Sequence, residues 1–137
     1  MRRVFVLASV FALGVALGAV APLTKAQGQG KTWEAPASAK AVENPVEATS
    51  ESVAAGKKMA QQSCAPCHGP GGKGDGPAAA ALPKKPADWT ADVVQAKTDG
   101  ELFWMISEGM PPMPPWKSLP ETDRWNLVNY MKSLGAK

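Results

Sequence analysis

Two cysteines and one histidine stand close together in the segment Cys64-Ala65-Pro66-Cys67-His68, and they are the only residues of these types in the chain. The segment has the C-x-x-C-H pattern of covalent haem attachment. Two thiols at this spacing can add across the two vinyl groups of one porphyrin. The histidine that follows then lies under the ring and binds the iron through a ring nitrogen. The pattern therefore predicts one covalent haem c, held by Cys64, Cys67 and His68.

Two other chemistries use cysteines at this spacing. A redox-active dithiol usually stands at the start of a helix in a βαβ setting, but the sequence has no alternating strand pattern. A structural zinc site needs four ligands, and the two cysteines and one histidine supply only three. Haem attachment is the interpretation that uses all five positions.

The second axial ligand of the iron cannot be another histidine of this chain, because His68 is the only one. Methionine, lysine, water or no ligand remain. Met110 and Met113 lie in a segment with four prolines in six residues, which cannot be helical. A core role is the default for the methionines in predicted helices, which are Met59, Met105 and Met131.

Of the two loop methionines, we expect Met113 to bind the iron. Gly109 is typical of the left-handed C′ residue that follows a helix, which makes Met110 the C″ residue. A C″ side chain packs back on its own helix, here on Met105 or Trp104, so Met110 has a structural role available. Met113 lies further into the loop, between two prolines that limit its backbone freedom. Met110 remains the alternative ligand.

The elements that must position these residues are three helices. The first is predicted from about residue 51 to 62, and the second from the capping box Thr98-Asp99-Gly100-Glu101 to Gly109. The third runs from about 121 to 134, and its core-facing apolar stripe consists of Leu127, Val128, Tyr130, Met131 and Leu134.

Long loops separate these helices. Residues 69–77 are rich in glycine, and residues 110–115 are rich in proline. Long irregular segments in a small domain normally need something to wrap around, and a haem is such an object. The predicted fold class is all-α, with three or more helices and long loops around one covalent haem.

The N-terminal residues predict export. Arg2 and Arg3 precede an uncharged apolar stretch, and small residues at Thr24 and Ala26 suit cleavage after residue 26. Residues 1–26 are thus a signal peptide or, if uncleaved, a membrane anchor. In both cases we expect the rest of the chain to be periplasmic.

Residues 27–49 are rich in Ala, Pro, Glu, Lys and Gln, and such a segment buries little apolar surface. We expect a flexible linker there, which would act as a tether if the signal is kept. The haem domain then spans residues 50–137.

The formal charge of +3 and the pI near 9.0 depend on the N-terminus. Without Arg2, Arg3 and Lys25, basic and acidic residues are equal in number. No segment concentrates Lys or Arg as nucleic-acid binding requires. Nucleic acid is therefore excluded as a partner.

Several of these segments together resemble the class I cytochrome c family over about residues 50–137. They are C-A-P-C-H, G-P-G-G-K-G-D-G-P, G-M-P-P-M-P-P-W and the final W-N-L-V-N-Y-M-K-S-L. The resemblance implies a crossing of the first and last helices, with Gly56 and Ala60 against Leu127 and Tyr130. It also implies a proline carbonyl, of Pro83 or Pro86, that accepts a hydrogen bond from His68. Met113-Pro114-Pro115-Trp116 fits the family's Met-Pro-x-aromatic pattern better than Met110 does.

These features predict a mono-haem electron carrier rather than an enzyme. His/Met ligation leaves no open iron position and raises the potential relative to His/His ligation. The expected partners are redox proteins that donate and accept electrons, met by a monomer or by a subunit of a complex. One alternative is a haem c subunit of a larger periplasmic or membrane oxidoreductase. Another is a ligand-binding haem protein with an open distal site.

Overall fold

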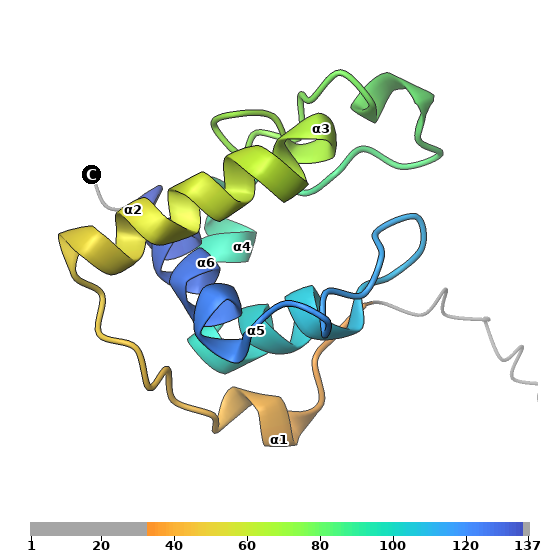
Figure 1. Ribbon diagram of the computed structural model, residues 1–137. Helices are drawn as coiled ribbons and strands as arrows, with labels where there is room; N and C mark the ends of the chain where they lie inside the picture. The colour runs from red at the N-terminus through yellow and green to blue at the C-terminus, as the bar shows by residue number, and fades with distance from the viewer. Residues whose placement is uncertain (1–32, 136–137) are drawn as a thin grey trace, which may run out of the picture. The chain divides into compact units, whose positions relative to one another are not determined.

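The computed structural model describes residues 33–135; the predicted signal at 1–26 and the start of the predicted linker lie outside the described residues. Its helices, in chain order, are α1 (Ala37–Lys40), α2 (Ser50–Met59), α3 (Ala65–His68), α4 (Asp92–Gln95), α5 (Asp99–Glu108) and α6 (Glu121–Ser133) (Figure 1). In this part of the chain, one isolated bridge between Met110 and Met113 is the only strand-like pairing. The all-α prediction is confirmed. None of these helices is long and apolar enough to span a membrane.

Helices α2 and α6 cross at a glycine. A Cβ atom added at Gly56 would collide with the backbone oxygen of Asn126 and with the Cβ of Tyr130. Only a residue without a side chain lets the two backbones approach this closely. The close contact that the family resemblance implied is present, with the Asn126 backbone as the nearest neighbour of Gly56.

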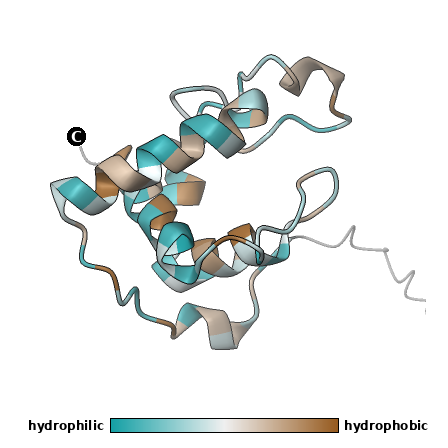
Figure 2. Cartoon of the chain, in the orientation of Figure 1, coloured by the Kyte–Doolittle hydropathy of each residue, from teal (hydrophilic) through white to brown (hydrophobic). Residues whose placement is uncertain are grey.

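The core lies along the predicted stripe of α6. Val128 is fully buried, and Leu127, Tyr130 and Met131 are at most 5% exposed. They form one cluster with residues of α5, of α4 and of the segment that precedes the haem motif. Figure 2 shows the hydrophobic residues of α5 and α6 within this arrangement.

Helix α5 begins with the predicted capping box. The Thr98 hydroxyl accepts a hydrogen bond from the Glu101 N–H at 3.2 Å, and the Glu101 carboxylate accepts one from the Thr98 N–H at 2.8 Å. Two backbone donors at the helix start are satisfied in this way. The helix ends at Glu108, and Gly109 follows as the C-cap with φ of 62°.

Residues 33–49 form an N-terminal arm. This arm differs from the expected flexible linker, because it packs against the helices. Ala35 and Ala39 are buried, and α1 lies along α5. Room for this contact comes from Gly100, where a Cβ atom would collide with the backbone oxygens of Ala39 and Val42. Composition alone suggested too little apolar surface; the close approach of backbones through small residues compensates for it.

The same arm is held by hydrogen bonds to one buried amide. Asn129 of α6 accepts from the Asn44 side chain at 2.7 Å and donates to the carbonyls of Val46 and Glu47 at 3.1 and 3.2 Å. It also lies 3.1 Å from the hydroxyl of Ser52 at the start of α2. Residues 44–52 are therefore fastened to α6 by a single side chain.

Candidate haem site

The haem motif follows α2 without a break in the helical path. Residues Ala60–Cys64 form a π-helical turn, in which the Ala65 N–H bonds to the Ala60 carbonyl, and α3 then ends at His68. Gly69 reverses the chain with φ of 76°. Because residues four apart share a helix face, Cys64 and His68 lie on the same side of this short segment. π-turns are frequent at functional sites, and this one lies directly before the motif.

The glycine-rich loop folds back over α3. The Gly74 N–H donates to the His68 carbonyl at 2.8 Å, the Gly76 N–H to the Cys67 carbonyl at 3.1 Å, and the Ala78 N–H to the Pro66 carbonyl at 2.8 Å. These bonds satisfy carbonyls that a helix end would otherwise leave free. The loop thereby fixes the backbone of the motif from outside it.

Both cysteines are free thiols and half-buried. Burial raises the pKa of the Cys64 thiol to about 11, and the neighbouring Cys67 adds to the same direction. A dithiol that exchanges disulfides needs a lowered pKa, because the thiolate is the nucleophile. This environment disfavours the dithiol interpretation and leaves two free thiols at the spacing that haem attachment uses.

His68 is held by a carbonyl that the sequence did not identify. Its Nδ1 lies 3.1 Å from the carbonyl oxygen of Ala87, so neither Pro83 nor Pro86 supplies the expected partner. The successive carbonyls of Pro86 and Ala87 point in different directions. That of Pro86 faces Gly74, where a Cβ atom would collide with it, and the next one reaches the histidine.

Burial lowers the pKa of His68, and the hydrogen bond to the Ala87 carbonyl partly offsets this effect. The neutral imidazole is therefore favoured. A neutral ring that donates from Nδ1 to a carbonyl carries its lone pair on Nε2, the atom that can bind a metal. The geometry supplies the kind of ligand that a haem iron requires.

Trp89 contacts the candidate ligand, and the sequence did not predict this contact. Its ring stacks on the His68 ring with a centroid distance of 4.7 Å and an interplanar angle of 29°, and it is only 5% exposed. Its ring also contacts Tyr130 of α6 edge-on, at a centroid distance of 6.4 Å. Trp89 lies in an irregular segment without periodicity, so no sequence signal pointed to this contact.

Met110 and Met113 stand at the two ends of one tight turn. The Met113 N–H donates to the Met110 carbonyl at 2.7 Å, and the bond between Pro111 and Pro112 is cis. Both methionines are half-buried. The segment after the turn is joined to α5, where the Trp116 N–H bonds to the Ile106 carbonyl at 3.2 Å.

The end of α5 differs from the prediction by one residue. Gly109 is the C-cap of α5 and not the C′ residue, and its ψ of 171° is outside the left-handed helical region. Met110 is therefore the C′ residue and not C″, so its place after the helix does not distinguish it from Met113 as the expected iron ligand.

The residues present fit a covalently bound haem. The motif offers two free thiols and a neutral imidazole with an available nitrogen, and its backbone is fixed by the following loop. In Figure 1, the loop after α3 and the loop after α5, which carries both methionines, extend on the same side of the helices.

Comparison with known proteins decides the family. Residues 51–131, more than half of the chain, match the family described as "Cytochrome C oxidase, cbb3-type, subunit III". The chain belongs to this c-type cytochrome family. The cytochrome is an electron-transfer haem protein with haem c as its cofactor.

Among solved structures, the cytochrome is similar to a chain of the Kuenenia stuttgartiensis reducing HAO-like protein complex Kustc0457/Kustc0458. The two share 32% sequence identity with a TM-score of 0.59, over 68% of this chain and 49% of the other. The match thus covers about half the length of that relative. No curated protein sequence matches the cytochrome.

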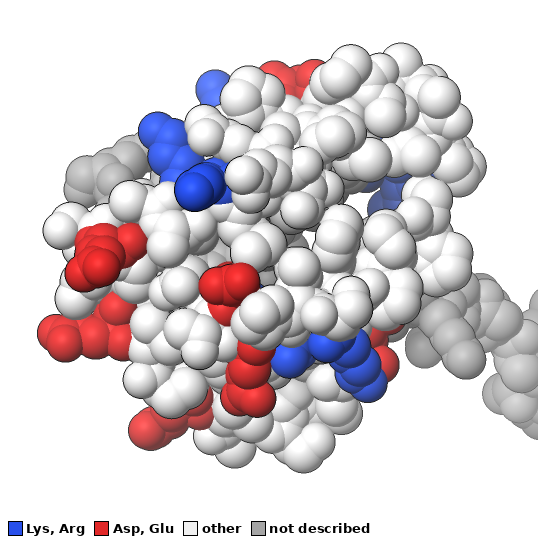
Figure 3. Space-filling view, viewed as in Figure 1, with Lys and Arg blue, Asp and Glu red and all other residues white. Residues whose placement is uncertain are grey.

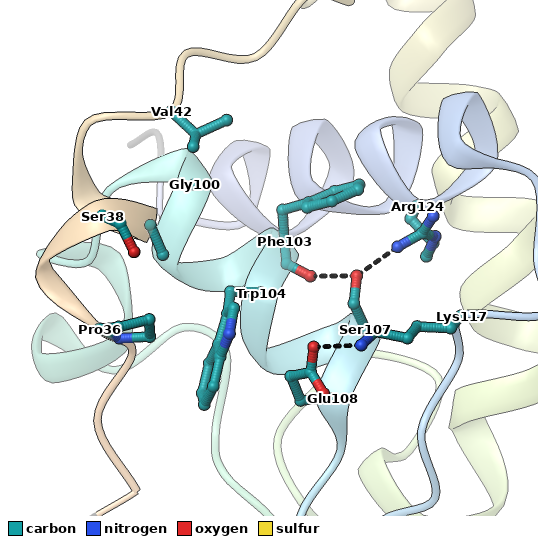
Figure 4. Close-up of a pocket in the computed structure, with 11 residues that line it drawn as sticks. Pro36, Ser38, Val42, Gly100, Phe103, Trp104, Ser107, Glu108, Lys117 and Arg124 are labelled. Carbon is teal, nitrogen blue, oxygen red and sulfur yellow. Dashed lines mark hydrogen bonds and ion pairs between the residues drawn. The ribbon is translucent and has the colours of Figure 1, made fainter.

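A separate groove of about 370 Å³ lies between the N-terminal arm and α5 (Figure 4). The guanidinium of Arg124 lies 4.5 Å over the Phe103 ring and donates to the Ser107 hydroxyl, which itself donates to the Phe103 carbonyl at 2.7 Å. An ion pair of Lys117 with Glu108 lines its edge. None of the groove's residues belongs to the haem motif or to the methionine turn.

Proposed function

We propose that this cytochrome carries single electrons between redox proteins in the periplasm, with one haem attached at Cys64 and Cys67 and its iron bound by His68 and Met113. The observation that carries the proposal is the state of His68, whose Nδ1 is bonded to Ala87 and whose neutral ring leaves Nε2 for a metal. When bound, the haem iron supplies a one-electron couple whose potential depends on its axial ligands.

The chain's own residues tune that couple. The carbonyl of Ala87 raises the basicity of the His68 ligand through the hydrogen bond from Nδ1. A methionine sulfur on the other side would occupy the last iron position, which leaves no open site for a substrate. An electron-transfer role rather than catalysis follows from such ligation.

Met113 is the methionine we propose as the second ligand. It lies between Pro112 and Pro114, and the Met-Pro-Pro-Trp segment that it begins ends at Trp116, which packs against the core and bonds to α5. This anchoring limits the positions open to Met113. Met110, at the other end of the same turn, is the competing ligand.

The partner surface we propose is the rim formed by the two loops beside the motif, residues 76–83 and 109–116. Neither segment contains Asp, Glu, Lys or Arg. Figure 3 shows the surface over α3 and the adjoining loops mostly free of charged side chains in this view. An apolar rim suits brief contact with the cofactor edge of another redox protein, since little charge must be desolvated.

A second candidate is a haem c subunit of a larger oxidoreductase. The similar solved chain belongs to a complex, and this favours lasting association with a second protein. Periplasmic location in either case rests on the export signal proposed for residues 1–26, which would also serve as a membrane tether if uncleaved. Copurification with a large partner would distinguish a subunit from a free carrier.

The function is tested by the mass and the absorption spectrum of the exported protein. The expected mass is that of the polypeptide plus one haem that survives denaturation. The expected spectrum is low-spin in both oxidation states and unchanged by carbon monoxide. The mass of the bare polypeptide would refute haem attachment, and a carbon monoxide complex of the ferrous protein would indicate an open, ligand-binding site instead.

A further inference from the structure

The segment from Pro86 to Thr90 contacts the His68 ring in two ways. The carbonyl of Ala87 accepts the hydrogen bond from Nδ1, and the ring of Trp89 stacks on the imidazole face at 4.7 Å. The edge and the face of one small ring are thus held by residues only two positions apart.

Trp89 itself is anchored on several sides. Its backbone N–H donates to the Gly72 carbonyl at 2.8 Å, and its backbone carbonyl accepts from the Gln95 side-chain amide at 2.5 Å. The same Gln95 amide donates to the Met131 carbonyl of α6 at 2.8 Å, and Tyr130 packs edge-on against the indole. Trp89 is therefore fixed to the glycine loop and to the last helix rather than to the motif.

A small turn couples the two contacts with His68. The Asp88 carboxylate accepts hydrogen bonds from the Thr90 N–H at 2.8 Å and from the Thr90 hydroxyl at 2.7 Å. Such a turn between neighbouring residues holds the backbone in one conformation. The turn consequently holds the carbonyl of Ala87 and the ring of Trp89 in a fixed position relative to each other.

We propose that Trp89 is a positioning residue that fixes the plane of the His68 ring and thereby keeps its Nδ1 on the carbonyl of Ala87. The proposal rests on the proposed role of His68 as an iron ligand. Rotation of an imidazole about its last side-chain torsion is soft, and a single hydrogen bond at one edge leaves the ring free to tilt. The buried ring of Trp89 against its face removes that freedom, so that the Nδ1 proton stays on the Ala87 carbonyl.

The test uses the ferric holoprotein with the variants Trp89→Leu and Trp89→Phe. The control is Trp104→Leu, a tryptophan that lines the groove beside α1 and not the His68 ring. Two NMR quantities report on the ligand: the pattern of haem methyl shifts, which follows the orientation of the His68 plane, and the solvent exchange rate of the His68 Nδ1 proton. Global stability is measured alongside, so that a merely destabilised protein is recognised.

We expect Trp89→Leu to speed exchange of the Nδ1 proton by about tenfold or more, since exchange follows local opening, and to change the methyl shift pattern. Trp89→Phe, which restores a flat ring, should lie close to the parent protein, as should Trp104→Leu. The proposal is overturned if Trp89→Leu leaves both quantities unchanged, or if Trp104→Leu alters them equally. If Trp89→Leu does not fold, Trp89→Phe and Trp89→Val are compared at equal stability. Equal exchange rates of the Nδ1 proton in these two variants overturn the proposal.

Failure of the proposed function has a different signature. If His68 were not an iron ligand, the parent protein itself would lack the low-spin spectrum and a hyperfine-shifted histidine proton. If only the Trp89 proposal is wrong, the parent keeps both, and the variants do as well.

Discussion

His68 depends on groups far outside the motif that contains it. In the proposed haem site, the hydrogen bond to the Ala87 carbonyl selects the nitrogen that would be left for the iron, and the stacked Trp89 ring would restrict the plane of the imidazole. The thiols of the motif would provide attachment, but these neighbours would determine how the proposed ligand is oriented. For the second iron ligand, the neighbours matter as well, because Met110 and Met113 share one turn and compete for this role.

The methionine pair gives a prediction at the scale of single residues. Met113→Leu should abolish the weak long-wavelength sulfur-to-iron band and open the iron to carbon monoxide. It should also lower the reduction potential by on the order of 100 mV, a part of the ~0.8 V that axial ligands span. A thioether favours ferrous iron, so its loss stabilises the ferric form. Absorption spectroscopy and potentiometry measure these changes.

The matched control is Met110→Leu, which alters the other end of the same turn. It should keep the band, and its potential should stay near that of the parent. If instead the band disappears in Met110→Leu and persists in Met113→Leu, Met110 is the ligand.

At the scale of elements, the start of α5 contains a pH-sensitive contribution to stability. The hydrogen bond from the Thr98 N–H holds the pKa of Glu101 below its usual value against the opposing effect of burial, and Lys40 at 3.6 Å and Lys97 act in the same direction as the hydrogen bond. A carboxyl group with a lowered folded-state pKa stabilises the protein above its unfolded pKa and loses this effect as the pH falls through the folded value.

Glu101→Gln should therefore destabilise the cytochrome near pH 7, and the difference from the parent should shrink at acid pH, as the carboxyl group becomes protonated. Denaturant unfolding at both pH values measures it. The exposed Glu43, changed to Gln, serves as the control and should have little effect at either pH. A difference for Glu101→Gln that grows on acidification would contradict the prediction.

At the scale of the whole molecule, the arm that precedes α2 is part of the folded domain. Asn129 binds Asn44, Val46, Glu47 and Ser52 through one buried amide. The arm thereby lies against α6 and α5 instead of extending from the domain, and α6 also contacts Trp89 through Tyr130.

Asn129→Ala should lower the free energy of unfolding by about 1–3 kcal/mol, because the buried partners lose their hydrogen bonds. Cleavage by a protease within residues 33–49 should become faster. Asn126→Ala, on the same helix and without a side-chain hydrogen bond to the arm, is the control. Equal protease resistance of Asn129→Ala and the parent would show that the arm is held by other contacts.

The features that the sequence determined by itself are local ones. The haem motif is five consecutive residues, the capping box of α5 spans Thr98 to Glu101, and the apolar stripe of α6 follows from helical periodicity. Each depends on residues within a few positions of each other, where backbone geometry fixes which side chains can meet.

The tertiary structure alone decided the contacts between distant segments. The partner of His68 is 19 residues away, at Ala87 rather than at a proline, and Asn44 meets Asn129 across 85 residues. Trp89 and most of the arm outside α1 lie in irregular backbone, which has no period from which a facing direction could be inferred. Such contacts arise only when the helices have packed, since the packing determines which carbonyl, amide or ring of a loop reaches the site.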